Sequence, residues 1–330
     1  MGAPNQNVWN VSEQDFPEGA ATETQLRFLL RFAILAPSPK NAQPWAFAVR
    51  DNKVSLVADL GRSHPISDPD RRELYIGVGC ALENLLVAAE HFGLQHSVSY
   101  FPYRWRAEVA ATVLFEAGGT VSASRAGTSL DAIRRRHNDT ALFHSTAVPA
   151  ELQRRLSACC EEPDLRFDLN DDDLFHRWID ALTVQSDRAD LANPAFRIEL
   201  EYWMSQGVFG GERNRGDDPA SILQRQRAIT LAHLRVESAP LLGLIRGAGD
   251  SHLIHIRTGQ LFERIWLTAT ALGISINPMS QTMRRPELRS AVTELMPSVG
   301  WIPQHLFRVG YSSAPRKPHT PRRPVEDVMR

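Results

Sequence analysis

A ten-residue stretch with three prolines, Ala36 to Trp45, constrains this chain more than any other segment. It reads Ala-Pro-Ser-Pro-Lys-Asn-Ala-Gln-Pro-Trp and stands between an apolar helical run and a hairpin pattern. The prolines exclude a regular helix or an inner strand here. The residues between them offer a hydroxyl, an ammonium, two amides and an indole. A stiff loop with these groups suits a planar heterocycle with donors and acceptors on its rim, although ordinary helix-to-strand loops contain the same residue types.

The literal string resembles the flavin-contacting loop of the nitroreductase family. That loop reads Pro-Ser, a short gap, Asn, one residue, and then Gln-Pro-Trp. The positions that match it are Pro37, Ser38, Asn41, Gln43, Pro44 and Trp45. The resemblance implies that the loop reaches an FMN ring across a subunit interface. It also implies that Pro37, Ser38, Asn41 and Gln43 bind the cofactor and that Trp45 packs beneath the loop.

Size and charge narrow the class of protein. The chain has 330 residues, is 43% hydrophobic and carries a net charge of -1, so nothing steers it to nucleic acid or to an anionic membrane. Its three cysteines are too few for a disulfide framework and favour a reducing compartment. The polar start, Met1 to Gly19, has no apolar signal core, and no stretch has the apolar length of a membrane span. We therefore expect a cytoplasmic protein.

Two segments resemble each other at an offset of 180 residues. In both 79–94 and 259–274, Gly, Glu, Ala and Gly recur at the same steps with matched apolar positions between them. Both have helical spacing and end at a glycine, Gly93 or Gly273, as a left-handed C-cap requires. Convergence of two amphipathic helices is the alternative, but the shared ends favour duplication.

The periodicity predicts helices and strands in two unequal halves. In the first half we expect a helix over 22–36, a hairpin of strands 45–50 and 53–59, a helix over 77–92 and a strand near 108–115. In the second half we expect helices over 128–137, after Pro149, and over 172–190, 194–205 and 257–272, a further helix ending near Val236, and strands over 241–246 and 305–311.

This order predicts an α+β fold with helices packed on mixed, mostly antiparallel sheets. A small-residue stretch, 118–124, has the composition of a linker. We therefore expect a flexible N-terminus over 1–20, a first half over 21–122 that carries the ring loop, and a second half over 123–330. The resemblance implies that the halves are tandem nitroreductase-like α/β sandwich domains forming a pseudo-dimer, as in the two-domain (Acg-like) group of that family.

A run of three arginines, Arg134 to Arg136, opens the second half. Guanidinium groups match phosphate oxygens, although a solvated basic helix end would look the same. The segment resembles a degraded form of the family's phosphate-binding motif, which implies that Arg135 or Arg136 holds the FMN phosphate and that Asn138 replaces a hydroxyl. The family's last arginine there is Thr140 in this chain. The basic tail resembles the segment that closes the phosphate site, which implies roles for Arg322 and Arg323.

Two further segments complete the expected site. The loop Ile276 to Gln281 resembles the one that passes along the flavin ring, which implies that Pro278, Met279 and Ser280 lie beside it; an ordinary turn is the alternative. Aromatic residues beside glycines over 196–216 predict a lid or a core edge, with Tyr202, Trp203 and Phe209 as candidates. The pair His252 and His255 lacks further ligands, so we expect no metal site.

The resemblance implies an FMN-dependent oxidoreductase that passes hydride through flavin N5 from NAD(P)H to a small organic acceptor, with no side chain needed as acid or base. A protein that sequesters FMN beneath a lid is the alternative, and a specialised FMN dehydrogenase or reductase of a biosynthetic pathway is a third possibility. Because both halves stand in one chain, a monomer is expected as readily as a homodimer.

Overall fold

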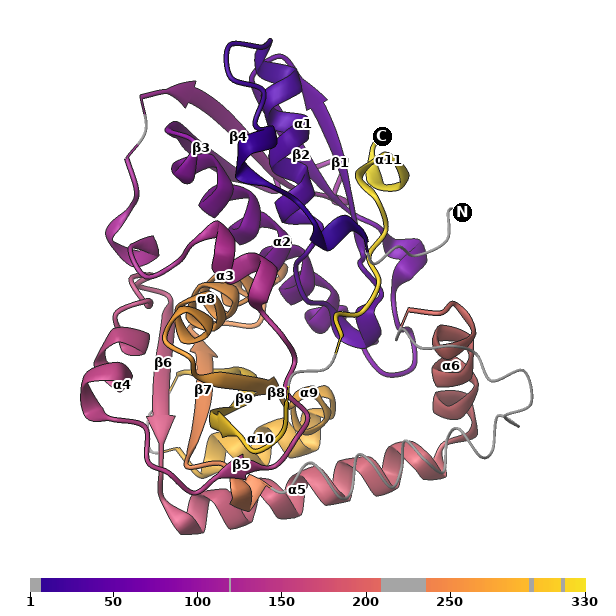
Figure 1. The fold of residues 1–330 in the computed structure, drawn as a ribbon. Helices are drawn as coiled ribbons and strands as arrows, with labels where there is room; N and C mark the ends of the chain where they lie inside the picture. The colour runs from indigo at the N-terminus through magenta and orange to yellow at the C-terminus, as the bar shows by residue number, and fades with distance from the viewer. Residues whose placement is uncertain (1–6, 119, 209–235, 297–299, 316–317) are drawn as a thin grey trace.

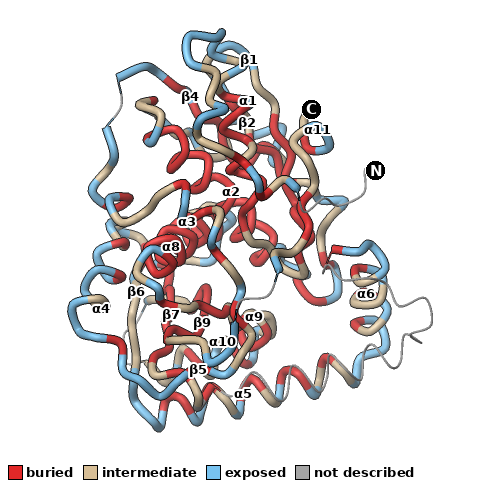
Figure 2. The backbone as a smooth tube through the Cα atoms, in the orientation of Figure 1, coloured by how far each residue is buried: buried red, intermediate tan, exposed pale blue. Residues whose placement is uncertain are grey.

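The computed structural model describes residues 7–118, 120–208, 236–296, 300–315 and 318–330. One sheet lies at each end of the molecule, and two long helices, α2 (Arg72–His91) and α8 (His252–Ala271), lie between them (Figure 1). Figure 2 shows these two helices as the buried centre of the tube. Almost every residue of both helices is buried. Helices buried on all sides are apolar around most of their circumference, as these two are.

The first sheet has the strand order β1-β2-β4-β3, and every neighbouring pair is antiparallel. Its strands are β1 (Trp45–Arg50), β2 (Lys53–Ala58), β3 (Leu94–Tyr100) and β4 (Val109–Ala117). Helix α1 (Thr22–Ala33) precedes β1, and α2 connects β2 to β3. A two-residue turn, Asp51–Asn52, joins β1 to β2 in the predicted hairpin, with Asp51 at a φ of 53°.

The second sheet repeats this order as β6-β7-β9-β8, again antiparallel throughout, and β5 pairs with β9 at its edge. Its strands are β5 (Phe143–His144), β6 (Leu165–Asn170), β7 (Leu241–Gly247), β8 (Ser275–Pro278) and β9 (Ile302–Ser312). Helix α4 (Ala150–Ser157) precedes β6 as α1 precedes β1, and α8 connects β7 to β8 as α2 connects β2 to β3. The two halves therefore share one connectivity.

Helices α2 and α8 cross at two glycines that stand 180 residues apart. A Cβ on Gly79 would lie 2.0 Å from the Ile256 carbonyl oxygen, and a Cβ on Gly259 would lie 2.0 Å from the Ile76 carbonyl oxygen. Each helix thus offers the same patch to the other, the reciprocal contact of a two-fold interface. The repeat at an offset of 180 has this close crossing as its structural counterpart.

The second half departs from the first by its insertions. Two helices, α5 (Asp173–Ala192) and α6 (Pro194–Ser205), lie between β6 and β7, where the first half has a two-residue turn. They extend along the lower edge and the right side of Figure 1. Helices α9 (Ser280–Arg284) and α10 (Pro286–Glu294) lie between β8 and β9, and α3 (Leu130–Arg135) opens the half.

The N-terminal and C-terminal segments both pack against the first half. The C-terminal segment, drawn in yellow in Figure 1, runs beside the first sheet to α11 (Val325–Val328). Met329 pairs in parallel with Phe47 of β1, and Val328 is buried. At the other end, Trp9 stacks on His319 with ring centroids 4.0 Å apart. Residues 7–20, expected within a flexible N-terminus, place Trp9 and Val11 in the core.

The α+β class with antiparallel sheets flanked by helices is confirmed. Strands β3, β6 and β8 escaped prediction because they are short or polar, as expected of strands at sheet edges. Helices α2 and α8 each begin five residues before the predicted starts at 77 and 257, since polar residues interrupt the apolar period there, Arg72 and Glu73 in α2 and His252 and His255 in α8. The predicted helix ending near Val236 lies outside the described residues. No helix in the described ranges meets the length and apolarity needed to span a membrane.

Candidate functional site

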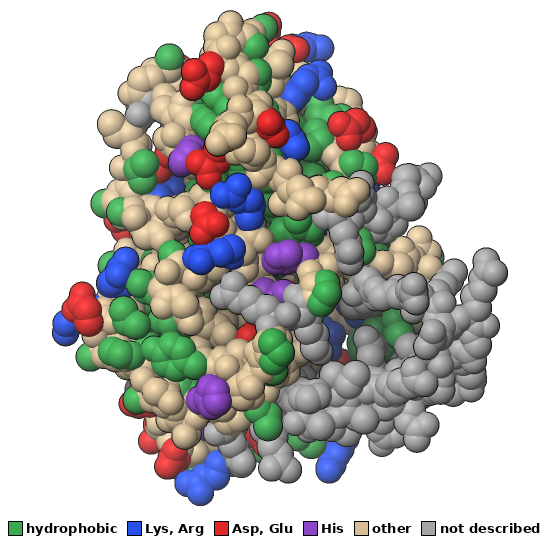
Figure 3. All heavy atoms as spheres, viewed as in Figure 1, with side chains coloured by type: hydrophobic (Ala, Val, Ile, Leu, Met, Phe, Trp, Pro, Cys, Tyr) green, Lys and Arg blue, Asp and Glu red, His purple; other side chains and the backbone are tan. Residues whose placement is uncertain are grey.

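A cavity of about 450 Å³ lies where the two halves meet. The loop after α1, the first turns of α2, the middle of α8, the end of β8 with α9, and the C-terminal segment all contribute to its wall. Its volume falls within the range of small-molecule sites. Figure 3 shows histidine (purple) and basic (blue) side chains near the middle of the face viewed.

The loop with three prolines has a strained backbone. Lys40, Asn41 and Gln43 have φ angles of 47°, 52° and 52°, a region that residues other than glycine seldom occupy. Such strain costs on the order of 1–3 kcal/mol per residue, and it is concentrated at functional sites. The Ser38 hydroxyl fixes the turn by accepting a hydrogen bond from the Gln43 N–H at 2.8 Å. The loop is therefore held in a defined shape against the cavity.

The loop is also joined to distant segments. The Asn41 amide donates to the carbonyl oxygens of Val208 and, at 2.8 Å, of Pro321. The fully buried Gln43 side chain accepts from the Arg323 N–H at 2.6 Å. A Cβ on Gly77 of α2 would lie 3.3 Å from the Ser38 Cβ, so α2 approaches the loop closely. The cavity wall is built from both halves.

Two buried arginines form one end of the cavity. Arg136 donates to the Leu35 carbonyl oxygen at 2.8 Å, and Arg322 donates to the same oxygen at 3.4 Å. The Arg136 guanidinium lies 4.6 Å from the Trp266 ring centroid. Arg322 lies 4.8 Å from the Trp9 ring centroid, and its Nε has no hydrogen-bond partner in the described structure. Two cations from segments far apart in sequence thus meet at one point.

Among the described residues, the carboxylate beside these cations is that of Glu263. Its Oε1 is 3.3 Å from the Arg136 Nε. Burial raises the pKa of Glu263 to about 7, although Arg136 acts in the opposite direction. Burial lowers the pKa of both Arg136 and Arg322, and for Arg322 the neighbouring Arg136 adds to the effect. This end therefore holds more positive than negative charge, which is the chemistry of an anion site.

The other end of the cavity combines Glu73 of α2 with His305 of β9. Burial raises the pKa of Glu73, but Arg72, whose Nη2 lies 2.8 Å from the carboxylate, reverses this effect, so the pKa is lowered overall. Burial lowers the pKa of His305 to about 4, against the influence of Glu73. His305 is buried, and neither ring nitrogen has a hydrogen-bond partner in the described part of the chain.

The predicted cofactor residues divide into two groups. Those that line the cavity are Pro37, Ser38, Asn41, Arg136, Asn138, Pro278, Ser280 and Arg322. Those outside its lining are Gln43, Arg135, Met279 and Arg323. Gln43 and Arg323 bind one another behind the loop, Arg135 pairs with Asp131 at 2.8 Å on the surface, and Met279 packs in the core of the second sheet.

The two predicted lid residues that the structure describes, Tyr202 and Trp203, are not part of the cavity lining. Trp203 is buried beside the loop, 4.7 Å from the His64 ring, and Tyr202 is 54% exposed. Phe209 lies outside the described residues. Glu199 of α6 attaches this insertion to the loop through an ion pair of 2.8 Å with Lys40. Among the described residues, no three His, Cys, Asp or Glu side chains are grouped as a metal site requires.

Sequence reasoning missed Glu73, Phe262, Trp266 and His305 among the residues that line the cavity. Glu73 stands before the predicted start of its helix. In the sequence, Phe262 and Trp266 have the helical spacing of core positions and no further local signal. His305 stands inside a strand pattern, where a buried histidine gives no signal of its own. The reciprocal helix repeat was the signal that could have placed Phe262 and Trp266 at the meeting of the halves.

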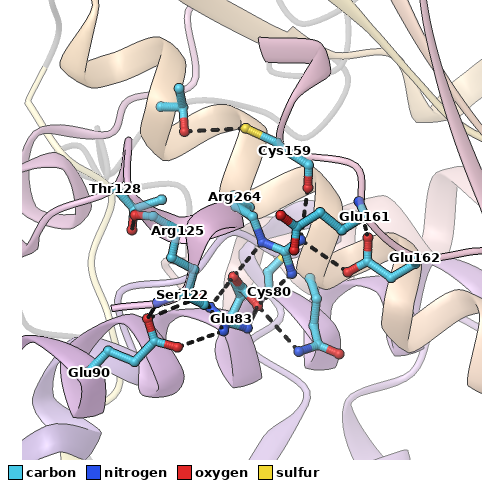
Figure 4. Close-up of polar contacts among 12 residues, drawn as sticks. Cys80, Glu83, Glu90, Ser122, Arg125, Thr128, Cys159, Glu161, Glu162 and Arg264 are labelled. Carbon is cyan, nitrogen blue, oxygen red and sulfur yellow. Dashed lines mark hydrogen bonds and ion pairs between the residues drawn. The ribbon is translucent and has the colours of Figure 1, made fainter. Parts of the chain in front are cut away.

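At the corresponding position on the other side of the helix crossing, buried charged side chains pair with one another (Figure 4). Glu83, the counterpart of Glu263, forms ion pairs of 2.7 Å with Arg125 and 2.9 Å with Arg264. Burial raises the pKa of Glu83, but the two arginines lower it to about 2. Arg264 replaces Asn84 at the offset of 180 and also reaches Glu162, in the loop that corresponds to the proline-rich one. The two halves therefore form unequal sites.

No protein-family model matches the chain. A "Putative NAD(P)H nitroreductase" of Mycobacterium tuberculosis is 26% identical over 95% of this chain and 92% of its own length. The chain is thus similar along most of its length to a protein named as a nitroreductase. A second relative from that organism, named as an uncharacterized protein, is 25% identical over 92% of each chain. The chain thus aligns with both relatives along nearly its whole length.

Solved structures of nitroreductases resemble part of this chain. An FMN-dependent nitroreductase of Mycobacterium smegmatis in complex with NADPH is 16% identical, covers 61% of this chain and 97% of its own, and has a TM-score of 0.41. A nitroreductase with bound FMN from Desulfitobacterium hafniense is 14% identical, covers 61% and 95%, and has a TM-score of 0.40.

Proposed function

We propose that the chain is an FMN-binding oxidoreductase of the nitroreductase type, with one cofactor site between two halves that act as an internal pseudo-dimer. The observation that carries the proposal is the meeting of Arg136 and Arg322 on the Leu35 carbonyl in the wall of the cavity. Leu35 directly precedes the loop that resembles the family's flavin loop. The proposed division into 21–122 and 123–330 is kept. The C-terminal tail belongs to the second half in sequence but packs against the first half.

The residues present fit a phosphate at this end. In the described part of the chain, Glu263 is the one carboxylate near both Arg136 and Arg322, and it is close to half protonated at pH 7. A bound phosphate would compensate the buried positive charge and would accept from the free Nε of Arg322. Asn138 lines the same wall, and its Oδ1 accepts from the Asn277 amide at 2.8 Å.

The rest of the cavity fits a flat ring. Ile76, Cys80, Phe262 and Trp266 provide apolar wall, and the loop from Pro37 to Asn41 provides a polar one. The hydrogen bonds that fix the strained loop hold these groups in place before the ligand arrives, which reduces the ordering cost of binding. When bound, FMN would supply hydride transfer, and the protein would supply binding, orientation and exclusion of water. NAD(P)H is the proposed donor and a small organic molecule the proposed acceptor.

One observation favours the alternative of a protein that sequesters FMN. The α5–α6 insertion is fixed to the flavin loop by Glu199, which pairs with Lys40 and accepts from the Ile66 N–H at 2.8 Å. The Lys40–Glu199 pair is partly buried, so removing one partner would leave a poorly solvated charge. An insertion held in this way could restrict access of a nicotinamide to the ring.

A visible spectrum of the purified protein tests the cofactor, and the same spectrum after addition of NADPH tests access. Absorbance of oxidised flavin that bleaches with NADPH is the result expected for the oxidoreductase. A flavin that dithionite bleaches but neither NADPH nor NADH bleaches would establish the sequestering function instead. A colourless protein that does not bind added FMN would overturn both.

Oligomeric state and location belong to the same proposal. With both halves in one chain, the site is complete without a second copy, so a monomer suffices for binding, and a homodimer of the pseudo-dimer is compatible with it. The three cysteines are free, which agrees with the proposed cytoplasmic location. Sedimentation of the FMN-bound protein distinguishes the two oligomeric states.

A further inference from the structure

We propose that His305, together with Glu73, is a binding site for the ring system of the cofactor and that His305 is retained at a cost to the stability of the empty protein. The inference rests on the proposed function, because it names residues that contact the same FMN. Neither residue is part of a sequence motif in this chain. The inference comes from their burial, their missing partners and their place in the cavity.

His305 is a buried polar group without a partner. Its side chain is 2% exposed, lines the cavity and has no hydrogen bond at either Nδ1 or Nε2 in the described residues. Buried polar side chains nearly always have a partner, and an unpaired one costs on the order of 1–3 kcal/mol. Because the imidazole is uncharged at neutral pH, it offers one N–H donor and one acceptor nitrogen. A ligand in the cavity is the partner that this geometry lacks.

The position of His305 identifies the part of the ligand that it meets. Its ring lies 4.2 Å from the Phe262 ring, whereas Arg136 lies over Trp266. Phe262 and Trp266 are four residues apart on α8, so these contacts are separated by about 6 Å along the helix axis. The arginines mark the phosphate end, and His305 therefore lies one helical turn away from it.

The Glu73–Arg72 ion pair beside His305 carries no net charge, so this end lacks the excess positive charge of the arginine end and favours a neutral heterocycle. Glu73 presents a carboxylate to the same end of the cavity, with Arg72 holding it in the charged form. A carboxylate repels a phosphate dianion but accepts readily from an N–H. A flavin ring carries both an N–H donor and carbonyl and nitrogen acceptors, which match a carboxylate beside a neutral imidazole.

The test compares the affinity for FMN and for riboflavin, measured by quenching of flavin fluorescence, with the melting temperature of the flavin-free protein. His305→Leu should weaken the binding of both flavins by the same factor, about 3- to 10-fold, which corresponds to one lost hydrogen bond. The melting temperature of the flavin-free variant should be equal to or above that of the unmodified protein, since an unpaired buried polar group has been removed. His305→Gln, which keeps a donor and an acceptor, should restore most of the affinity.

His255→Leu is the matched control, because His255 is equally buried on α8 but is absent from the cavity lining and pairs with Asp250 at 2.9 Å. It should lower the melting temperature and leave both flavin affinities unchanged. The inference is overturned if His305→Leu binds flavin as tightly as the unmodified protein, or if only FMN and not riboflavin is weakened. Failure of the unmodified protein to bind either flavin would instead overturn the proposed function.

Discussion

Arg322 and Arg323 are neighbours in the chain with different surroundings. The Arg322 side chain is buried in the cavity wall. The Arg323 side chain is 16% exposed, lies outside the cavity lining and interacts with Asp59, Asp327 and the main chain of Gln43. Side-chain direction therefore separates a candidate phosphate ligand from a residue that fixes the tail. From the sequence alone, the same role at the phosphate site is expected for both arginines.

Arg322→Gln should weaken FMN binding by about 10- to 100-fold, because charge-assisted hydrogen bonds to phosphate contribute roughly 1.5–3 kcal/mol. No described carboxylate forms an ion pair with Arg322, so its removal leaves no unpaired acid and the melting temperature should change little. Arg323→Gln is the matched control and should change the affinity less than twofold. Fluorescence titration with FMN measures both, and equal effects of the two variants would contradict this assignment.

Glu263 gives the site a defined pH dependence. Its pKa is raised to about 7, so it is neutral below pH 7 and negatively charged above it. A negative charge beside the arginines disfavours a bound phosphate, so FMN affinity should fall as the pH rises from 7 to 8.5. The fall should be at most about tenfold per pH unit, because one proton is linked to binding.

Affinities measured over this pH range test the role of Glu263, because the phosphate of FMN, with a second pKa of about 6, keeps nearly constant charge above pH 7. Glu263→Gln should make the affinity independent of pH in the same interval. A variant that retains the full pH dependence would show that another group is responsible.

At the scale of elements, the crossing of α2 and α8 determines where the halves meet. Gly79→Ala or Gly259→Ala places a methyl group 2.0 Å from a backbone carbonyl oxygen, which cannot move away as a side chain can. Overpacking of this kind usually costs about 1–3 kcal/mol and occasionally more, and a backbone contact belongs at the upper end. Denaturant unfolding should show this loss for both variants, since the contact is reciprocal.

Gly249→Ala is the control for this crossing, since an added Cβ there has no heavy atom within 4 Å and the φ of Gly249 lies outside the left-handed range. Its free energy of unfolding should stay within about 0.5 kcal/mol of the unmodified protein. If Gly79→Ala and Gly259→Ala are equally harmless, the helices do not approach as closely as described.

At the scale of the whole molecule, the C-terminal segment connects the second half to the first. It contributes Arg322 to the cavity, then places Val328 in the core and Met329 beside β1. Val328→Asp should therefore lower the free energy of unfolding by about 2–4 kcal/mol, because it buries a charge in place of an apolar group. It should also weaken FMN binding, although Val328 is absent from the cavity lining.

Glu326→Ala, on the exposed side of α11, is the control and should leave both the melting temperature and the FMN affinity unchanged. Calorimetry and fluorescence titration of the same samples separate the two effects. A Val328→Asp variant that loses stability but keeps its full FMN affinity would show that the tail positions Arg322 without help from α11.

Local order in the sequence determined a large part of this protein. Three prolines and the residues between them specified a rigid polar loop, and the apolar period with terminal glycines specified two long related helices. The hairpin with its Asp51–Asn52 turn and the α+β class followed from period and turn chemistry. These features depend on neighbours in the chain, so the sequence contains them directly.

Only the tertiary structure decided which residues of these segments share the cavity. Arg136 points into the cavity whereas Arg135 does not, and Arg322 points into it whereas Arg323 does not. The reason is that burial depends on which face of a segment packs against distant elements. Glu73 and His305 come together because the start of α2 lies against β9 of the second sheet. No local sequence pattern near either residue predicts this contact. The sequence determined the two halves and their loop, and the contact between the halves determined the site.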